Sequence, residues 1–289
     1  MLTGIANSIS LLPLAAVDRK AVSAFPHIDG LSWITNSMVV SVLVMVFILV
    51  LARLVSKDLK KVPTGAQNLA EAFIETLYNF IESIVGKSIA PRAFPLLATF
   101  FFFFLFANWF GLLPGVGTVG VYHANEAGVM EFNPLLRPTA ADLNAGIGIA
   151  LVFFVLWLVI SIQETGVKGF FAHLFAPKGK SANKFMMGFL ALIFLFVGCL
   201  EVISISIRQV SLPLRIYGNV FAGENLLHEM SALGYKMGLN DMVAWAMAAV
   251  VPIPFFFLEI LVGFLQAVVF TLLCAVYIQL STTHDEEHH

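Results

Sequence analysis

The sequence has few charged side chains. Only 12% of its 289 residues are Asp, Glu, Lys or Arg, whereas a soluble globular domain has about a quarter. So few charges cannot cover a surface that faces water, and much of the outside must therefore face lipid. The 16 basic residues are offset by 18 acidic ones, which excludes the basic face that a nucleic-acid-binding protein needs.

Cysteine and catalytic motifs are also scarce. Cys199 and Cys274 lie in apolar runs without a Cys-x-x-Cys pair, so we expect two small buried hydrophobic residues. The segment 178–181, Lys-Gly-Lys-Ser, lacks the glycine spacing of a phosphate-binding loop. His284 and His288 lie in an acidic tail, where solvated side chains are expected. The sequence predicts no hydrolytic centre, no metal site and no cofactor.

Long apolar runs take the place of these features. Hydrophobic residues make up 59% of the chain, and the mean hydropathy is +0.91. A membrane-crossing helix needs about 20 predominantly apolar residues. Three runs fit that length, and they predict spans at 31–55, 94–113 and 142–164. The sequence therefore indicates an all-α integral membrane protein formed as a single domain over 1–289.

Two further apolar runs are longer than one upright crossing requires. They cover 185–232 and 242–283, and at about 1.5 Å per residue both exceed a hydrocarbon core of about 30 Å. Each is either a pair of short spans or one inclined helix. Charged groups part-way along favour inclined helices that border a wet cavity. We predict five crossings, the last two long and strongly tilted.

The segment 63–87 is amphipathic. Leu69, Phe73, Leu77, Phe80 and Ile84 recur at steps of three and four, and acidic residues occupy other faces. This pattern is typical of a surface helix. We expect it to lie along the membrane interface or on a partner, without spanning.

Loop charges predict the orientation. Lysines concentrate after the first span and after the third, whereas the loop 115–141 carries Arg137 as its one basic residue. Basic loops stay in the cytoplasm. We therefore expect an external N-terminus, with an uncleaved segment at 1–30, and a cytoplasmic C-terminus.

Polar residues recur at steps of three or four in the fourth apolar run, so that one helix face stays polar. They are Glu201, Ser204, Arg208, Ser211, Arg215 and Asn219. Glu224 lies nine residues beyond Arg215, a rotation of roughly 180°, and points elsewhere. An intramembrane arginine bounded by two acids indicates a path for charge. The alternatives are a structural arginine paired with a carboxylate on another helix and, for Arg208, a side chain that snorkels to the interface.

The last apolar run repeats this pattern. Glu259, Gln266 and Tyr277 fall close to one angular position, which gives a stripe of carboxylate, amide and phenol suited to protons or water. A polar link between helices is the alternative for Gln266. On these residues alone, an ion-coupled transporter fits as well as any other ion-translocating protein.

One segment is specific enough to indicate a family. Residues 211–224 read Ser-Leu-Pro-Leu-Arg-Ile-Tyr-Gly-Asn-Val-Phe-Ala-Gly-Glu, and they strongly resemble subunit a of the rotary F-type ATP synthase. Further matches follow in the same order, at 107–109 with 112–114, at 137–144, and at 265–270 followed by Tyr277. The resemblance covers roughly residues 30–283. Pro213 departs from the pattern, because a small residue is usual there, and a proline can kink a helix.

The resemblance implies a stator beside a rotating ring of c subunits, with two offset half-channels for ions. Arg215 matches the essential arginine, which attracts the ionised ring carboxylate and separates the half-channels. Glu224 and Glu259 match positions of the external half-channel, with Asn219 and Gln266 as polar companions.

The remaining candidates have less defined roles. Asp142 is an entry-side candidate, and Glu201, with Ser204 and Arg208, suits the exit path. Ser211 and Tyr277 are polar positions on the two stripes. His228 is either a proton relay or an interfacial histidine.

The implied protein has no catalytic site of its own and works as a subunit of the proton-translocating ATP synthase. Its expected partners are the c-subunit ring, the peripheral-stalk b subunits, the remaining ATP synthase subunits and membrane lipid. We expect it in the inner membrane of a bacterium, with an organellar energy-transducing membrane as the alternative. The proton is the expected ion. The competing hypothesis is a self-sufficient ion-coupled secondary transporter, in which internal repeats are common; none is seen here.

Overall fold

The computed structural model describes residues 34–57, 60, 65–113, 116, 119–124, 130–175 and 184–282. Within them, five helices are long and apolar enough to cross a membrane. The prediction of an all-α membrane protein with five crossings is confirmed. The segment 1–30 and the histidines of the C-terminal tail lie outside the described residues.

The helices lie close to the predicted ranges. They are α2 (Asn36–Ser56), α3 (Ala66–Val85), α4 (Ala90–Gly111), α5 (Leu143–Phe175), α6 (Lys184–Lys236), α7 (Asp241–Val250) and α8 (Pro252–Thr282). The third apolar run continues past its predicted end, but α5 is kinked at Gly166, whose φ is 72°. Because the left-handed region suits glycine, the straight part of the span ends there.

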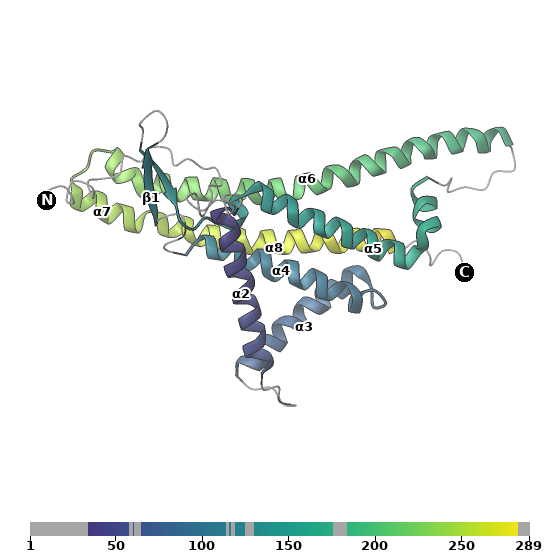
Figure 1. Cartoon of the computed structure of the whole chain (residues 1–289), viewed down its shortest axis with the longest axis horizontal. Coiled ribbons are helices and arrows are strands. Elements are labelled where there is room, and N and C mark those ends of the chain that lie inside the picture. Colours follow the sequence, from purple (N-terminus) through teal and green to yellow (C-terminus); the bar gives the residue numbers. More distant parts are fainter. Residues whose placement is uncertain are drawn as a thin grey trace.

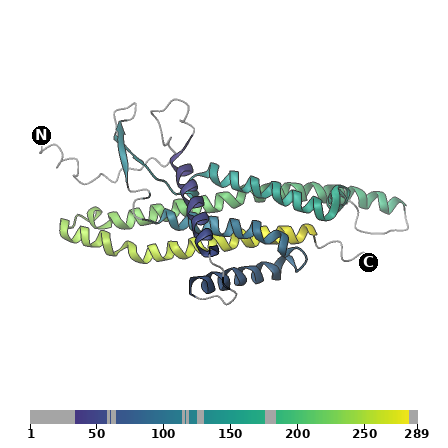
Figure 2. The same ribbon diagram turned by 60° about the horizontal axis from the view of Figure 1, so that its bottom comes forward.

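The last two crossings are as long as their sequences predict. Helix α6 has 53 residues, and α7 with α8 forms one apolar stretch of 40 residues over Asp241–Leu280. These lengths correspond to ~80 Å and ~60 Å of helix. Helices α4, α5, α6 and α8 run broadly along the long axis of the molecule, and α2 crosses their direction steeply (Figures 1 and 2).

A small β-hairpin interrupts the otherwise helical chain. Strands β1 (Gly120–Ala124) and β2 (Met130–Pro134) pair antiparallel, with Tyr122 opposite Phe132. A short 3-10 helix, η1 (Thr139–Ala141), follows it and leads into α5. No pattern in the sequence predicted this hairpin.

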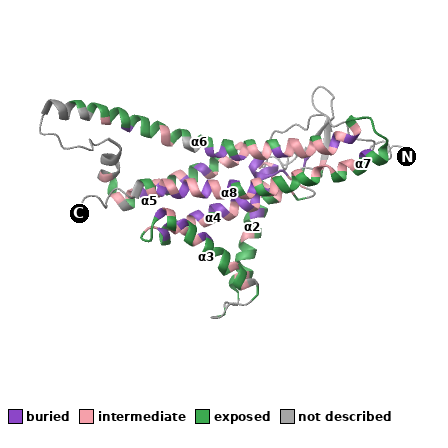
Figure 3. Cartoon of the chain, turned by 180° about the vertical axis from the view of Figure 1, so that it is seen from behind, coloured by how far each residue is buried: buried purple, intermediate pink, exposed green. Residues whose placement is uncertain are grey.

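The core lies where α3, α4, α5 and α8 meet. Its fully buried residues include Ile81, Leu97, Phe153, Phe270 and Ile278. The amphipathic helix α3 contributes Leu77, Ile81 and Val85 to this core, whereas Leu69, Phe73 and Phe80 are exposed. Only part of its apolar face therefore packs on its own chain. In Figure 3 buried residues concentrate in this central region, and α2 and the first half of α6 are largely exposed. In the most apolar 18-residue stretch of α6, only 6% of the residues are buried. The surface of this stretch is therefore free to contact lipid or partner subunits.

Two expectations from the sequence need correction or completion. Cys274 is buried, but Cys199 is exposed on α6, so the expectation that both are buried was wrong for Cys199.

Helix α6 runs through Pro213 as one element. A Cβ added to Gly146 on α5 would lie 3.0 Å from the Pro213 Cβ, so Pro213 forms the close contact between these two helices.

Candidate functional site

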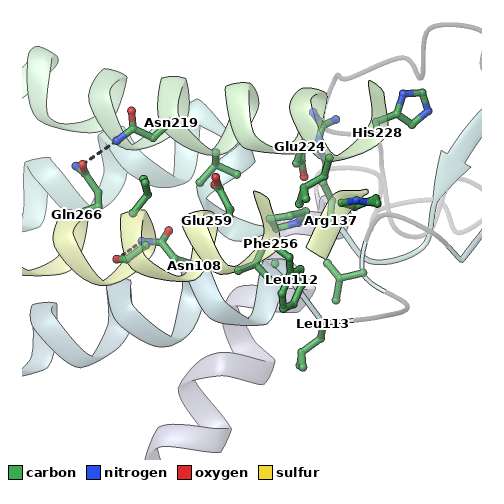
Figure 4. Close-up of a pocket in the computed structure, with 18 of the residues that line it drawn as sticks. Asn108, Leu112, Leu113, Arg137, Asn219, Glu224, His228, Phe256, Glu259 and Gln266 are labelled. Carbon is green, nitrogen blue, oxygen red and sulfur yellow. Dashed lines mark hydrogen bonds between the residues drawn. The ribbon is translucent and has the colours of Figure 1, made fainter. Parts of the chain in front are cut away.

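A pocket of about 480 Å³ lies between α6 and α8. Residues of α4 and of the segment that precedes α5 complete its walls (Figure 4). Its apolar lining includes Leu112, Ile216 and Phe256. Its polar lining consists of Asn108, Arg137, Asn219, Glu224, His228, Ser231, Glu259 and Gln266. The pocket therefore brings together five of the residues predicted from the sequence: Asn219, Glu224, His228, Glu259 and Gln266.

The two amides at one end of the pocket join α6 to α8. Asn219 donates a hydrogen bond from Nδ2 to Oε1 of Gln266, at 3.0 Å. On the opposite wall, Asn108 of α4 donates from Nδ2 to the backbone oxygen of Gly263, at 3.1 Å. Oδ1 of Asn108 and Nε2 of Gln266 are buried and have no hydrogen-bond partner among the described residues. Such atoms are natural sites for ordered water.

The two carboxylates occupy the middle of the pocket. Figure 4 shows Glu259 and then Glu224 between the amide pair and His228. Both side chains are half-buried. A Cβ on Gly223 would overlap the carboxyl group of Glu259, so this glycine gives Glu259 its place against α6. The arrangement puts two groups that accept and release protons in one confined space.

The opposite end of the pocket is held by the beginning of α2. Asn36 donates to the backbone oxygen of Pro134 at 2.8 Å, and Ser41 is within 3.1 Å of the Thr139 hydroxyl. These contacts fix the segment 134–142, which carries Arg137. Arg137 is only 4% exposed, and it lies at the Glu224 end of the pocket, as His228 does (Figure 4).

Asp142, the entry-side candidate, lies outside this pocket. Its carboxylate accepts a 2.6 Å hydrogen bond from the Ser37 hydroxyl and a 3.0 Å bond from the Asn144 amide. The second bond caps the beginning of α5, since a carboxylate at this position satisfies a free N–H of the first turn. Asp142 therefore anchors α2 to α5, and it lines a separate, very small cavity beside Pro213.

Arg215 faces away from the pocket. It is exposed, whereas Leu212 and Ile216 on the same turn are buried. Asn219 follows one helical turn later, so the amide pair lies next to the arginine along α6. Ser211 is exposed as well.

The other predicted residues lie apart from the pocket. Glu201 is exposed on the earlier part of α6, Ser204 is half-buried, and the side chain of Arg208 lies outside the described residues. Tyr277 is further along α8, where its backbone oxygen accepts a hydrogen bond from Nε1 of Trp157 at 3.1 Å. Tyr277 does not line the pocket.

Three polar pocket residues, Asn108, Arg137 and Ser231, were not among the predicted site residues. Asn108 is an isolated amide in a phenylalanine-rich span, and Arg137 is the one basic residue of its loop. A polar group alone in an apolar run was the available signal. Their shared position depends on α4 and η1 meeting at the same point, which residue spacing does not reveal.

The fold and the pocket define a polytopic α-helical membrane protein with a polar path between two long helices, the class to which ion-translocating proteins belong. The family model described as ATP synthase A chain matches residues 38–279. The chain therefore belongs to this family, subunit a of the ATP synthase, which is the ion-translocating subunit of the membrane sector.

Individual proteins described as ATP synthase subunit a are similar to this chain. ATP synthase subunit a of Mycobacterium ulcerans is 30% identical, over 79% of this chain and 78% of that protein. Subunit a of Desulforamulus reducens is 28% identical, over 91% of this chain and 85% of its own length. Subunit a of Moorella thermoacetica is 29% identical, over 85% of this chain and 89% of that protein. The resemblance found in the sequence is confirmed.

Proposed function

We propose that the chain conducts protons through two offset half-channels beside a ring of c subunits, and that this passage drives rotation and ATP synthesis. The pocket between α6 and α8 is the external half-channel. One observation carries the proposal: a single pocket contains two intramembrane carboxylates, Glu224 and Glu259, and ends at an amide pair one turn from Arg215.

A proton enters at the His228 end and passes to Glu224 and then to Glu259. From there it reaches the amide pair, Asn219 and Gln266. Nine residues separate His228 from Asn219 along α6, which corresponds to ~13 Å. Two carboxylates and a few waters can cover this distance by exchanging hydrogen bonds. The unpartnered amide atoms of Asn108 and Gln266 support the presence of such waters.

Arg215 acts at the ring. Its guanidinium is charged at any relevant pH, and its planar fork suits a carboxylate. Its exposure on α6 leaves it available to a neighbouring subunit. The arginine attracts an ionised ring carboxylate, favours release of its proton, and prevents a direct leak between the half-channels. Glu201, Ser204 and Arg208 border the exit path.

The working assembly includes the c ring, the peripheral-stalk b subunits and the remaining ATP synthase subunits. We place the N-terminus outside and the C-terminus in the cytoplasm of a bacterial cell. The lysine-rich loops support this orientation. In Figure 1 the hairpin and α7 lie toward the left, α5 and α8 end toward the right, and α2 ends at the bottom.

A matched pair of carboxylates on α6 tests the external path. Glu224 lines the pocket, whereas Glu229 is exposed and forms an ion pair with Lys236. The complete ATP synthase complex is reconstituted in vesicles, and ATP-driven proton pumping is measured with Glu224→Gln and with Glu229→Gln. We expect Glu224→Gln to slow pumping and Glu229→Gln to leave it unchanged. Equal rates in both variants would remove Glu224 from the path.

A further inference from the structure

Arg137 is a buried cation without a direct ion pair among the described residues. Its side chain is 4% exposed and lines the pocket that also contains Glu224 and Glu259. Nη1 has no hydrogen-bond partner in the described part of the chain. Burying a charge without a partner is costly, so such a group needs water or a nearby opposite charge to be tolerated.

The position of Arg137 is fixed by the residues around it. The next residue, Pro138, packs against the end of α4, where a Cβ on Gly111 would lie 3.0 Å from the Pro138 Cβ. Further along the chain, η1 and Asp142 are bonded to Ser41 and Ser37 of α2, and before Arg137 the Pro134 oxygen accepts a hydrogen bond from Asn36. These contacts fix the backbone on both sides of Arg137 at the wall of the pocket.

The described residues form no ready metal-binding cluster of His, Cys, Asp or Glu, but the pocket lining contains oxygen atoms of the kinds that metal ions bind. Glu224 and Glu259 supply carboxylate oxygens, and Oδ1 of Asn108 is a buried amide oxygen without a described partner. Carboxylate and amide oxygens together with water are the ligands that Ca²⁺ selects. The volume of about 480 Å³ also accommodates a partly hydrated ion.

We propose that Arg137 is a specificity-determining residue: it keeps metal cations, Ca²⁺ above all, out of the external half-channel and leaves the path to protons. This inference rests on the proposed function of the pocket. A fixed positive side chain in a narrow path opposes other cations through charge repulsion. A proton avoids this repulsion for the most part, because it is passed between acids and waters and does not have to be coordinated by both carboxylates at once.

The charges that face Arg137 come from two helices. Helix α6 contributes Glu224 and His228, and α8 contributes Glu259. The lining residues of α4 are uncharged. Two ionised carboxylates against one permanent cation leave a net charge of −1 when His228 is neutral. Removal of the guanidinium charge leaves −2, which favours a divalent cation.

The test uses the complete ATP synthase complex in vesicles, with the external side of the subunit facing the lumen. CaCl₂ is trapped in the lumen at graded concentrations and is absent outside, and ATP-driven proton pumping is measured. The variants are Arg137→Met, which fills a similar volume without charge, and Arg137→Lys, which keeps the charge. Arg53→Gln, at an exposed site near the end of α2, is the control for loss of an arginine elsewhere.

We expect half-inhibition of Arg137→Met at a luminal Ca²⁺ concentration about tenfold lower than for the unmodified complex. The reason is that removal of one positive charge strengthens Ca²⁺ binding modestly in a partly solvated pocket. Arg137→Lys, which keeps the positive charge, and Arg53→Gln should keep the half-inhibiting Ca²⁺ concentration of the unmodified complex. Ser231→Asp adds a carboxylate to the same pocket and leaves Arg137 in place, so it should also increase sensitivity to Ca²⁺. Because Arg137 is unchanged in Ser231→Asp, this result does not depend on any contribution of Arg137 to folding.

The outcomes separate this inference from the proposed function. Arg137→Met could pump protons in the absence of Ca²⁺ and show the same Ca²⁺ inhibition curve as the unmodified complex. This outcome would overturn the proposed role of Arg137 and leave the proposal of the half-channel standing. Unchanged Ca²⁺ sensitivity of Ser231→Asp would likewise contradict the charge argument. Failure of Glu224→Gln to slow pumping would instead count against the half-channel itself.

Discussion

At the scale of single residues, the pocket depends on the absence of one side chain. Gly223 lies against the carboxyl group of Glu259, and any Cβ there would occupy the same space. The glycine thus lets a carboxylate of α8 sit against α6, within the pocket that also holds Glu224. Small residues permit such close approach between membrane helices.

Gly223→Ala should displace Glu259 and slow proton pumping, while the complex still assembles, because alanine is a better helix former than glycine. Gly148→Ala is the matched control: it also lies within a helix, and a Cβ there would meet no atom within 4 Å. Pumping and subunit content are measured on both complexes. Normal pumping by Gly223→Ala would show that the position of Glu259 is not critical.

Glu259→Leu should slow ATP-driven pumping by about tenfold, less than the roughly hundredfold effect of losing a single well-placed acid or base. Glu224 and water remain in the pocket and partly replace it. Glu229→Leu, at an exposed position of α6, is the control. Pumping at the unmodified rate in Glu259→Leu would exclude this carboxylate from the mechanism.

Residue spacing predicted part of this site. The steps between Glu259 and Gln266 place them on one side of α8, and both line the pocket. Spacing within a helix says nothing about which other helix faces that side. Arg137 and Asn108 were therefore missed as pocket residues, and Asp142 proved to cap α5 and to bind Ser37.

At the scale of elements, the beginning of α2 controls the position of the segment that closes the pocket. Three side chains of its first turns, Asn36, Ser37 and Ser41, bond to residues between 134 and 142. Most of the rest of α2 is exposed and apolar, so these polar contacts determine where the helix attaches.

Ser37→Ala should destabilise this attachment by about 1–3 kcal/mol, because a buried carboxylate of Asp142 loses a hydrogen bond. Ser37 is fully buried, with 0% exposure. Ser206→Ala is the control, since Ser206 is exposed and bonds only to the backbone of its own helix. The midpoint of thermal dissociation of the purified complex measures the effect. Equal midpoints would show that the Ser37–Asp142 bond contributes little.

Apolar length and charge spacing predicted the helices well, because a segment in lipid must satisfy its backbone groups internally and so becomes a helix. The hairpin is different. Its strands have five residues each, too short for a clear alternating pattern, and their register depends on pairing between 120–124 and 130–134. The kink of α5 at Gly166 was likewise not visible in composition.

At the scale of the whole molecule, the orientation follows from the distribution of basic residues. After replacement of Cys199 and Cys274, Lys57→Cys should react with a membrane-impermeant thiol reagent from the cytoplasmic side. Met237→Cys, in the exposed turn between α6 and α7, should react from outside. Labelling of both positions from the same side would contradict the five-span topology.

The arrangement of the long helices gives the subunit two distinct surfaces. The pocket lies between α6 and α8, and Arg215 lies on an exposed surface of α6 next to its inner end. In the proposed mechanism, a permanent salt bridge between Arg215 and a ring carboxylate would hold the rotor in place. We therefore expect water to moderate this attraction, since Coulomb energies are steep at low dielectric and modest in a solvated site.

The most direct measurement is coupled proton pumping by the assembled complex with Arg215→Ala, with subunit content determined on the same preparation. The account predicts normal assembly, no ATP-driven pumping and no ATP synthesis, with an increased passive proton leak. Arg215→Lys should restore little, because lysine lacks the planar fork. Coupled pumping that persists in Arg215→Ala would contradict the central claim, and a complex that fails to assemble would identify Arg215 as a structural residue.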